Sequence, residues 1–134
     1  MELIHQPPTG GRPLVQSYGN GRFRVSGQPF QGSILLLPDR TEAWSVKSMA
    51  DLTIKSLQPL IDFEPAIELL IIGCGPSLTP APVTLRDVFR TKKIGVETMD
   101  TGAACRTYNV LAGEERRVGA ALIMQLEEIP SSSD

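Results

Sequence analysis

The strongest constraint on the fold of this 134-residue chain is the alternation of strand-like and helix-like segments in its second half. Short apolar stretches at 67–72, 95–99 and 116–124 have the length and composition of strands. Between them, segment 83–92 has apolar residues near helical spacing and a basic end, and segment 100–111 begins at a capping residue. The order strand, helix, strand, helix, strand predicts right-handed crossovers and parallel pairing of at least the first two strands.

The first half is predicted to be rich in β-strands that pair mostly antiparallel. Asn20-Gly21 lies between segments 14–18 and 23–25 and indicates a hairpin, because its turn needs positive φ angles. Further strands are expected at 28–31, 33–37 and 42–46. Segment 51–62 is predicted to be a short helix or turn, since Pro59 interrupts its apolar spacing.

The composition is typical of one domain, which we expect to span residues 1–134. Residues 1–13 are predicted to form an irregular arm and residues 130–134 a frayed tail. Hydrophobic residues make up 41% of the chain but aromatic residues only 5%, so we expect a mainly aliphatic core. The predicted fold class is α/β, with a β-rich N-terminal half and a β-α-β-α-β C-terminal half.

Charge and hydropathy argue against several functions. A formal net charge of −2 argues against general binding of nucleic acid, which usually needs a basic surface. No apolar run approaches the roughly 20 residues of a transmembrane helix, and the N-terminus lacks a signal-peptide pattern. One histidine and two cysteines give little basis for a metal site or a disulfide framework. We therefore expect a cytoplasmic protein with no metal ion and no other cofactor.

Two loops are the best candidates for a functional site. If strands 67–72 and 95–99 are parallel neighbours, loops 73–76 and 100–106 emerge at the same edge of the sheet, where open α/β sheets tend to bind ligands. Gly73-Cys74-Gly75 is compatible with a tight turn or with an anion site made by backbone amides. A dinucleotide loop is disfavoured, because the third glycine is missing and prolines follow.

In segment 100–106, which follows the predicted strand 95–99, the conspicuous residues are better explained by helix capping and packing than by catalysis. Asp100 or Thr101 is expected to cap a helix. The match of Asp-Thr-Gly to aspartic proteases is weak, because that chemistry needs two facing carboxylates. Cys105 is interpreted as a packing residue, although a helix N-terminus can activate a thiol. A redox pair with Cys74 is conceivable if the two loops are adjacent.

Helical spacing divides the side chains of segment 104–111. Positions 104, 108 and 111 share one face, so Ala104, Tyr108 and Leu111 are predicted to pack on the sheet. Thr107 and Asn109 lie off that face and are candidates for contact with a partner. Cys105 lacks a nearby histidine that could act as a base, so a cysteine–histidine enzyme is poorly supported.

Three stretches resemble a known family that includes the mitochondrial complex I assembly factor 3, the adipogenesis-associated protein and bacterial and archaeal single-domain proteins. They are IELLIIGCG (67–75), IGVETMDTGAACRTYNVL (94–111) and RRVGAALI (116–123), whereas GSILLLPDRTEAWSV (32–46) fits more loosely. The resemblance implies a three-layer α/β domain with a central mixed sheet and no established enzyme activity. One departure is Cys74, because the family loop commonly reads Gly-Thr-Gly.

The expected function is a non-enzymatic protein-binding or assembly role, in respiratory complex I or membrane-protein biogenesis, with components of those systems as partners. The alternative is a small-molecule or anion binder, or an enzyme, that uses the crevice between loops 73–76 and 100–106. No catalytic residue is assigned, and a homo-oligomer is left open. The candidate binding residues are Gly73, Cys74, Gly75, Asp100, Thr101, Cys105, Arg106, Thr107, Tyr108 and Asn109.

Overall fold

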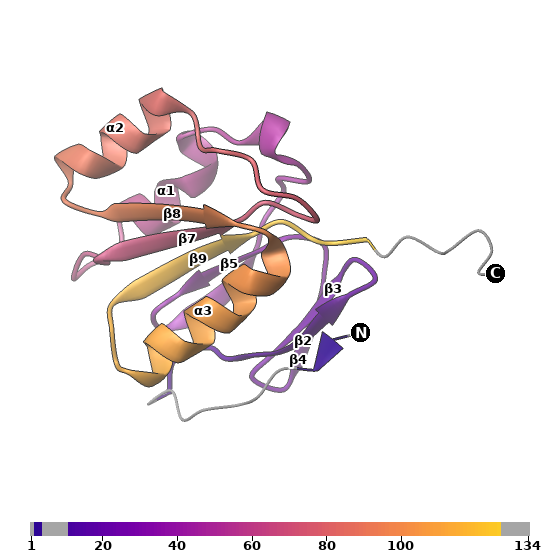
Figure 1. The fold of residues 1–134 in the computed structure, drawn as a ribbon. Helices are drawn as coiled ribbons and strands as arrows, with labels where there is room; N and C mark the ends of the chain where they lie inside the picture. Colours follow the sequence, from indigo (N-terminus) through magenta and orange to yellow (C-terminus); the bar gives the residue numbers. More distant parts are fainter. Residues whose placement is uncertain (1, 4–10, 127–134) are drawn as a thin grey trace.

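A five-stranded mixed sheet forms the centre of the domain in the computed structural model, which describes residues 2–3 and 11–126 (Figure 1). Its strand order is β6-β5-β9-β7-β8. The strands are β5 (Ile34–Leu37), β6 (Arg40–Ala43), β7 (Leu69–Gly73), β8 (Gly95–Met99) and β9 (Val118–Leu122). Strand β7 pairs in parallel with both β8 and β9, which confirms the predicted parallel pairing, and β5 pairs antiparallel with β9 and β6.

A smaller antiparallel sheet is built from the first part of the chain. Its order is β1 (Glu2–Leu3), β2 (Val15–Gly19), β3 (Arg22–Val25) and β4 (Gln28–Gln31). The predicted hairpin is confirmed, because Asn20 and Gly21 turn the chain with φ angles of 55° and 70°. The expectation of an irregular arm at 1–13 is wrong at residues 2–3, which pair with β2; the predicted tail at 130–134 lies outside the described residues.

Helical segments cover both faces of the central sheet. They are the 3-10 helices η1 (Met49–Asp51) and η2 (Lys55–Leu57) and the α-helices α1 (Gln58–Ile61), α2 (Val83–Thr91) and α3 (Thr101–Gly113). Pro59 lies in the first turn of α1, where the missing N–H breaks no helical hydrogen bond. Helices α1 and α2 lie on one face, and α3 lies on the other with the smaller sheet (Figure 1). These layers confirm the expected three-layer α/β fold.

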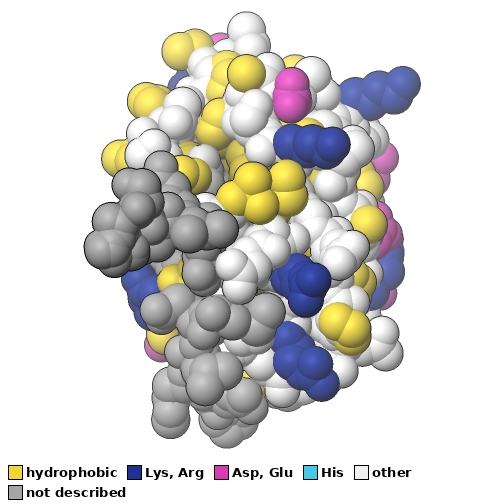
Figure 2. All heavy atoms as spheres, turned by 90° about the vertical axis from the view of Figure 1, so that its right-hand side faces the viewer, with side chains coloured by type: hydrophobic (Ala, Val, Ile, Leu, Met, Phe, Trp, Pro, Cys, Tyr) yellow, Lys and Arg dark blue, Asp and Glu magenta, His cyan; other side chains and the backbone are white. Residues whose placement is uncertain are grey.

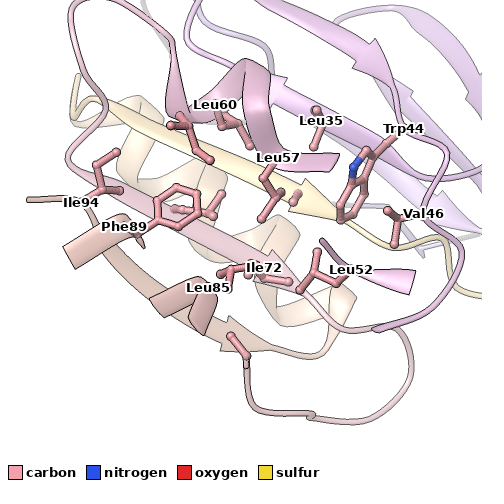
Figure 3. Close-up of a cluster of buried hydrophobic side chains, with 14 of the residues drawn as sticks. Leu35, Trp44, Val46, Leu52, Leu57, Leu60, Ile72, Leu85, Phe89 and Ile94 are labelled. Atoms are coloured by element: carbon pink, nitrogen blue, oxygen red, sulfur yellow. The ribbon is translucent and has the colours of Figure 1, made fainter. Parts of the chain in front are cut away.

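Two hydrophobic clusters, one on each face of the central sheet, hold these layers together. The first cluster joins the sheet to α1 and α2 through side chains such as Leu60, Leu85 and Phe89 (Figure 3). Trp44, the single tryptophan, packs in this cluster, and its Nε1 donates to the Ser56 carbonyl at 2.8 Å. The second cluster joins the sheet to α3 and the smaller sheet and is rich in valine, alanine and isoleucine as well as two tyrosines.

Several strand boundaries differ from those expected by one to three residues. The strand predicted at 42–46 is observed as β6, which ends at Ala43 because its partner β5 begins at Ile34, opposite Ala43. The next residues leave the sheet, and Trp44 and Val46 turn into the first cluster. Strand β8 and strand β4 have the predicted bounds, 95–99 and 28–31.

Candidate functional site

The two predicted loops meet at the carboxyl ends of β7 and β8, joined by the side chain of Thr101. The Thr101 hydroxyl accepts from the Gly75 N–H at 2.8 Å and donates to the Ile123 carbonyl at 2.7 Å. The Thr101 N–H donates to the Gly75 carbonyl at 2.9 Å. Thr101 is fully buried, so it connects the loop after β7, the start of α3 and the end of β9 as part of the interior.

The backbone donors of these loops are used inside the protein. The Cys74 N–H donates to the Met99 carbonyl at 2.8 Å, and the Ala103 N–H donates to the Asp100 carboxylate at 2.9 Å. Asp100 is thus the N-cap of α3, as predicted. The N–H groups of Gly75 and Thr101 are also hydrogen-bonded within the protein. With Cys74 and Ala103, four backbone N–H groups that could have bound an anion therefore already have partners. This arrangement disfavours an anion site at these four amides.

The two glycines of the loop serve different structural needs. A Cβ atom on Gly73 would lie 3.0 Å from Thr101 Cα and 3.1 Å from its Oγ1, so glycine permits the close approach of α3 to the end of β7. Gly75 has a φ of +93°, which other residues rarely adopt. Both positions are therefore explained by backbone geometry, in agreement with the tight-turn interpretation.

The two cysteines lie on opposite faces of the central sheet. Cys74 belongs to the cluster beneath α2 and donates to the Thr79 carbonyl at 3.2 Å, whereas Cys105 belongs to the cluster beneath α3. Both are free thiols and both are buried. Burial raises the pKa of the Cys105 thiol to about 12, so it stays protonated near neutral pH. This placement fits packing and gives no support to a redox pair.

The inward face of α3 is wider than helical spacing predicted. Ala104 and Tyr108 are fully buried, and Leu111 packs partly against the same cluster, as expected. Asn109 is buried as well: its Oδ1 accepts from the Val15 N–H at 3.0 Å, and its Nδ2 donates to the Val15 carbonyl at 2.8 Å. Asn109 is therefore unavailable to a partner, contrary to its expected exposure, because α3 lies between two sheets and buries a second side.

The predicted site residues thus divide into two groups. The buried group is Gly73, Cys74, Gly75, Thr101, Cys105, Tyr108 and Asn109, of which the last four hold α3 in place. Burial also raises the pKa of Tyr108, whose hydroxyl has no hydrogen-bond partner among the described residues. Asp100 and Arg106 are exposed, and Thr107 is half-buried. No group of three or more potential metal ligands occurs in residues 2–3 and 11–126.

A groove of about 460 Å³ lies beside the loop after β7 and holds two of the predicted residues, Cys74 and Gly75. The rest of its lining is Lys47, Ser48, Met49, Pro76, Thr79, Ile123, Met124 and Leu126. Two large apolar side chains at this edge are 65% exposed: Leu126 in the lining, and Leu78 in the loop that carries Pro76 and Thr79. The sequence reasoning missed these residues, although two leucines outside any predicted element were a usable signal.

The face that contains this edge is partly apolar. Figure 2 looks onto the side toward which β7, β8 and β9 run in Figure 1. Hydrophobic side chains gather across its upper and central parts, with basic side chains around them. Exposed apolar area of this kind is typical of surfaces that bind other proteins. No helix in the part of the chain described is long and apolar enough to span a bilayer, and the expected cytoplasmic location stays a prediction.

This combination of layers defines an Mth938-like α/β domain. A Bordetella pertussis protein described by that term is 32% identical, with a TM-score of 0.75 over 92% of each chain. A Bartonella henselae protein described as an outer membrane protein is 36% identical, with a TM-score of 0.81 over 90% of this chain and 99% of that one. The pattern of the family described as protein of unknown function DUF498/DUF598 matches residues 15–123, and the chain belongs to this family.

Curated relatives confirm the resemblance seen in the sequence. The zebrafish (Danio rerio) NADH dehydrogenase [ubiquinone] 1 alpha subcomplex assembly factor 3 is 32% identical over 120 residues, which are 90% of this chain and 69% of that protein. The human protein of the same name is 35% identical over 109 residues, which are 81% of this chain and 59% of that protein. The chain therefore spans about three fifths to two thirds of the length of these relatives.

Proposed function

We propose that this protein is a non-enzymatic assembly factor that binds a protein partner at the groove beside loop 73–76. The observation that carries the proposal is the apolar groove with Leu78 and Leu126 exposed at the same edge. Two large, exposed leucines lose water-accessible apolar surface when a partner covers them, which favours association. The occupant is a hydrophobic segment of a partner protein.

The names of the relatives support a proposal for the class of partner. Proteins that are 32% and 35% identical carry the name of an assembly factor for NADH dehydrogenase, which is respiratory complex I. We therefore propose that the partner is a subunit of that complex or a component that inserts such subunits into the membrane. Asp100 at the N-terminus of α3, and Arg106 and Thr107 in the middle of that helix, are proposed as additional polar contacts. A homo-oligomer stays a prediction.

Affinity capture of the tagged protein from its own cells in mild detergent tests this proposal. The variant Leu78→Ser/Leu126→Ser removes the exposed leucines without opening the core, since both side chains are 65% exposed. The matched control is Ile54→Ser/Val110→Ser, which removes exposed apolar side chains at other places. Quantitative mass spectrometry should find complex I subunits with the wild type and the control but not with the leucine variant. Equal recovery with all three proteins would refute the groove as the binding surface.

A small-molecule ligand is the second candidate, and the volume of the groove favours it. About 460 Å³ lies within the range of ordinary ligand pockets, about 300–1,000 Å³. Lys47 is the one basic residue in its lining, so the ligand class is a mainly apolar molecule with one acidic group. Thermal shift against a panel of such metabolites tests this candidate. A rise in melting temperature that Lys47→Gln abolishes would support it, and no shift would count against it.

A further inference from the structure

Strand β8 lies at the end of the central sheet and has one edge without a strand partner among the described residues (Figure 1). Its hydrogen bonds show which groups face outward. The Gly95 N–H donates to the Glu68 carbonyl at 2.9 Å, and the Met99 carbonyl accepts from Cys74 at 2.8 Å. Because successive residues of a strand face opposite sides, Val96 and Thr98 direct their N–H and C=O groups to the open edge.

A basic hollow of about 330 Å³ adjoins this open edge. It is lined by Arg86, Arg90, Lys93, Ile94, Gly95 and Val96. Arg86 and Arg90 are four residues apart on α2 and therefore lie on the same side of that helix. Arg90 forms an ion pair with Asp87 at 3.2 Å, but both side chains are more than half exposed, so the pair is weak and readily exchanged. Three cations thus surround a space next to backbone groups that can bind a strand.

The helix dipole explains only part of this charge. Arg90 and Lys93 lie at the C-terminal end of α2, where a positive charge is favourable. Arg86 is the fourth residue of α2 and lies nearer its other end, where the dipole gives it no such advantage. Its Nε donates only at 3.4 Å to the Ala81 carbonyl. A ligand of opposite charge is a physical reason for placing Arg86 on this side of the helix.

We propose that the open edge of β8 binds an extended segment of a partner protein that carries acidic residues at alternate positions. The segment adds a sixth strand by bonding to the outward N–H and C=O groups of Val96 and Thr98. Val96 packs on the side of the sheet covered by α2, so every second side chain of the added strand points toward Arg86, Arg90 and Lys93. Carboxylates at those positions complement the three cations.

Glu97 adds selectivity to this surface. It is exposed, and by strand alternation its side chain points to the face opposite Val96. A segment with acidic residues on that face meets a like charge, whereas one with acidic residues only on the α2 side does not. The expected segment therefore has acidic residues on one face and apolar or neutral residues on the other.

This surface goes beyond the proposed function and is tested independently of it. The groove lies beside the loop after β7, and the basic hollow lies at the beginning of β8, with Gly95 and Val96 in its lining. Neither Leu78 nor Leu126 lines the hollow. If the leucine variant captures partners as well as the wild type does, the groove proposal fails but strand addition at β8 is untouched. If the peptide does not bind at β8, the groove proposal is likewise untouched.

The test uses a synthetic seven-residue peptide that alternates valine and glutamate, with blocked ends and a fluorophore. Fluorescence anisotropy measures its affinity for the whole protein, and amide NMR shifts locate the contact. We expect the amide signals of Val96 and Thr98 to shift most. The variant Arg86→Gln/Arg90→Gln should weaken binding about fivefold or more, since two partly desolvated ion pairs are lost. The control Arg22→Gln/Arg24→Gln, on exposed residues of β3, changes the net charge equally and should leave the affinity unchanged.

A second set of probes tests strand addition apart from charge. A peptide N-methylated on alternate amides keeps its glutamates but loses the donors that pair with β8, and it should not bind. The variant Thr98→Pro removes an N–H that faces away from β7, so the sheet is retained while peptide binding is lost. Unshifted Val96 and Thr98 amides at saturating peptide, equal affinity for the arginine variant, or equal binding of the N-methylated peptide would each overturn the proposal.

Discussion

The buried hydroxyl of Thr101 offers a quantitative test of how the loops are held. The substitution Thr101→Val keeps the shape of the side chain but removes the group that bonds to the Gly75 N–H and the Ile123 carbonyl. Each buried polar group left without a partner costs about 1–3 kcal/mol. The two losses together predict a decrease of about 2–6 kcal/mol in the free energy of unfolding. Ordinary domains have only about 5–15 kcal/mol, so this one atom matters greatly.

A matched control separates the hydroxyl from the rest of the side chain. Thr101→Ser keeps both hydrogen bonds and removes one buried methyl group, which costs about 1 kcal/mol. Urea titration can follow the fluorescence of Trp44, the single tryptophan, which is buried in the core next to α1 and η2. The valine variant should be the less stable of the two by about 1 kcal/mol or more. Equal stability of the two variants would refute the structural role assigned to the hydroxyl.

Further results are expected at three residues in the interior of the domain. Cys105 should react slowly with alkylating reagents near pH 8, because burial raises its pKa to about 12. The pKa of this thiol in the unfolded chain is about 9.0, so its contribution to stability is complete below that pH and is lost as the pH rises toward 12. The variant Cys105→Ala should flatten the fall of the urea midpoint in this range, and an unchanged slope would contradict the reasoning. Gly102→Ala should lower stability by about 1–3 kcal/mol, because the added Cβ atom collides with the hydroxyl of Tyr18, and a melting temperature equal to that of the wild type would be unexpected. Asn109→Ala should cost about 2–4 kcal/mol in the same urea titration, since it leaves the N–H and C=O groups of Val15 without partners; a loss below about 1 kcal/mol would show that water replaces the amide.

Local sequence signals predicted the elements well, because turns, caps and apolar periodicity act over a few residues. The Asn20-Gly21 turn, the Asp100 cap and the bounds of β8 all follow from such signals. The β-α-β-α-β order also predicted the parallel pairing of β7 and β8, since crossover connections leave little choice of direction. The family resemblance then supplied the central mixed sheet, which periodicity alone does not specify.

Contacts between distant residues were beyond local reasoning. Asn109 was assigned to the outer side of its helix, because helical spacing reveals one packed face and cannot show that a second sheet covers another side. Its partner, Val15, is 94 positions away in the sequence. The groove has the same origin, since its lining comes from segments 47–49, 74–79 and 123–126, which only the folded chain brings together.

The position of β9 has a consequence for how this chain reaches its fold. Val118–Leu122 is the last strand described in sequence but lies third in the order β6-β5-β9-β7-β8, between β5 and β7. Before β9 is added, β5 and β7 are not paired with each other, and each has an edge of unpaired backbone N–H and C=O groups. During synthesis the growing chain can therefore form hairpins and one βαβ unit, but it cannot close its core before residue 122 has left the ribosome. Strand β9 joins the β6-β5 pair to the β7-β8 pair, so a chain that stops before residue 118 lacks the strand that unites the sheet, which is far more damaging than the loss of a peripheral strand.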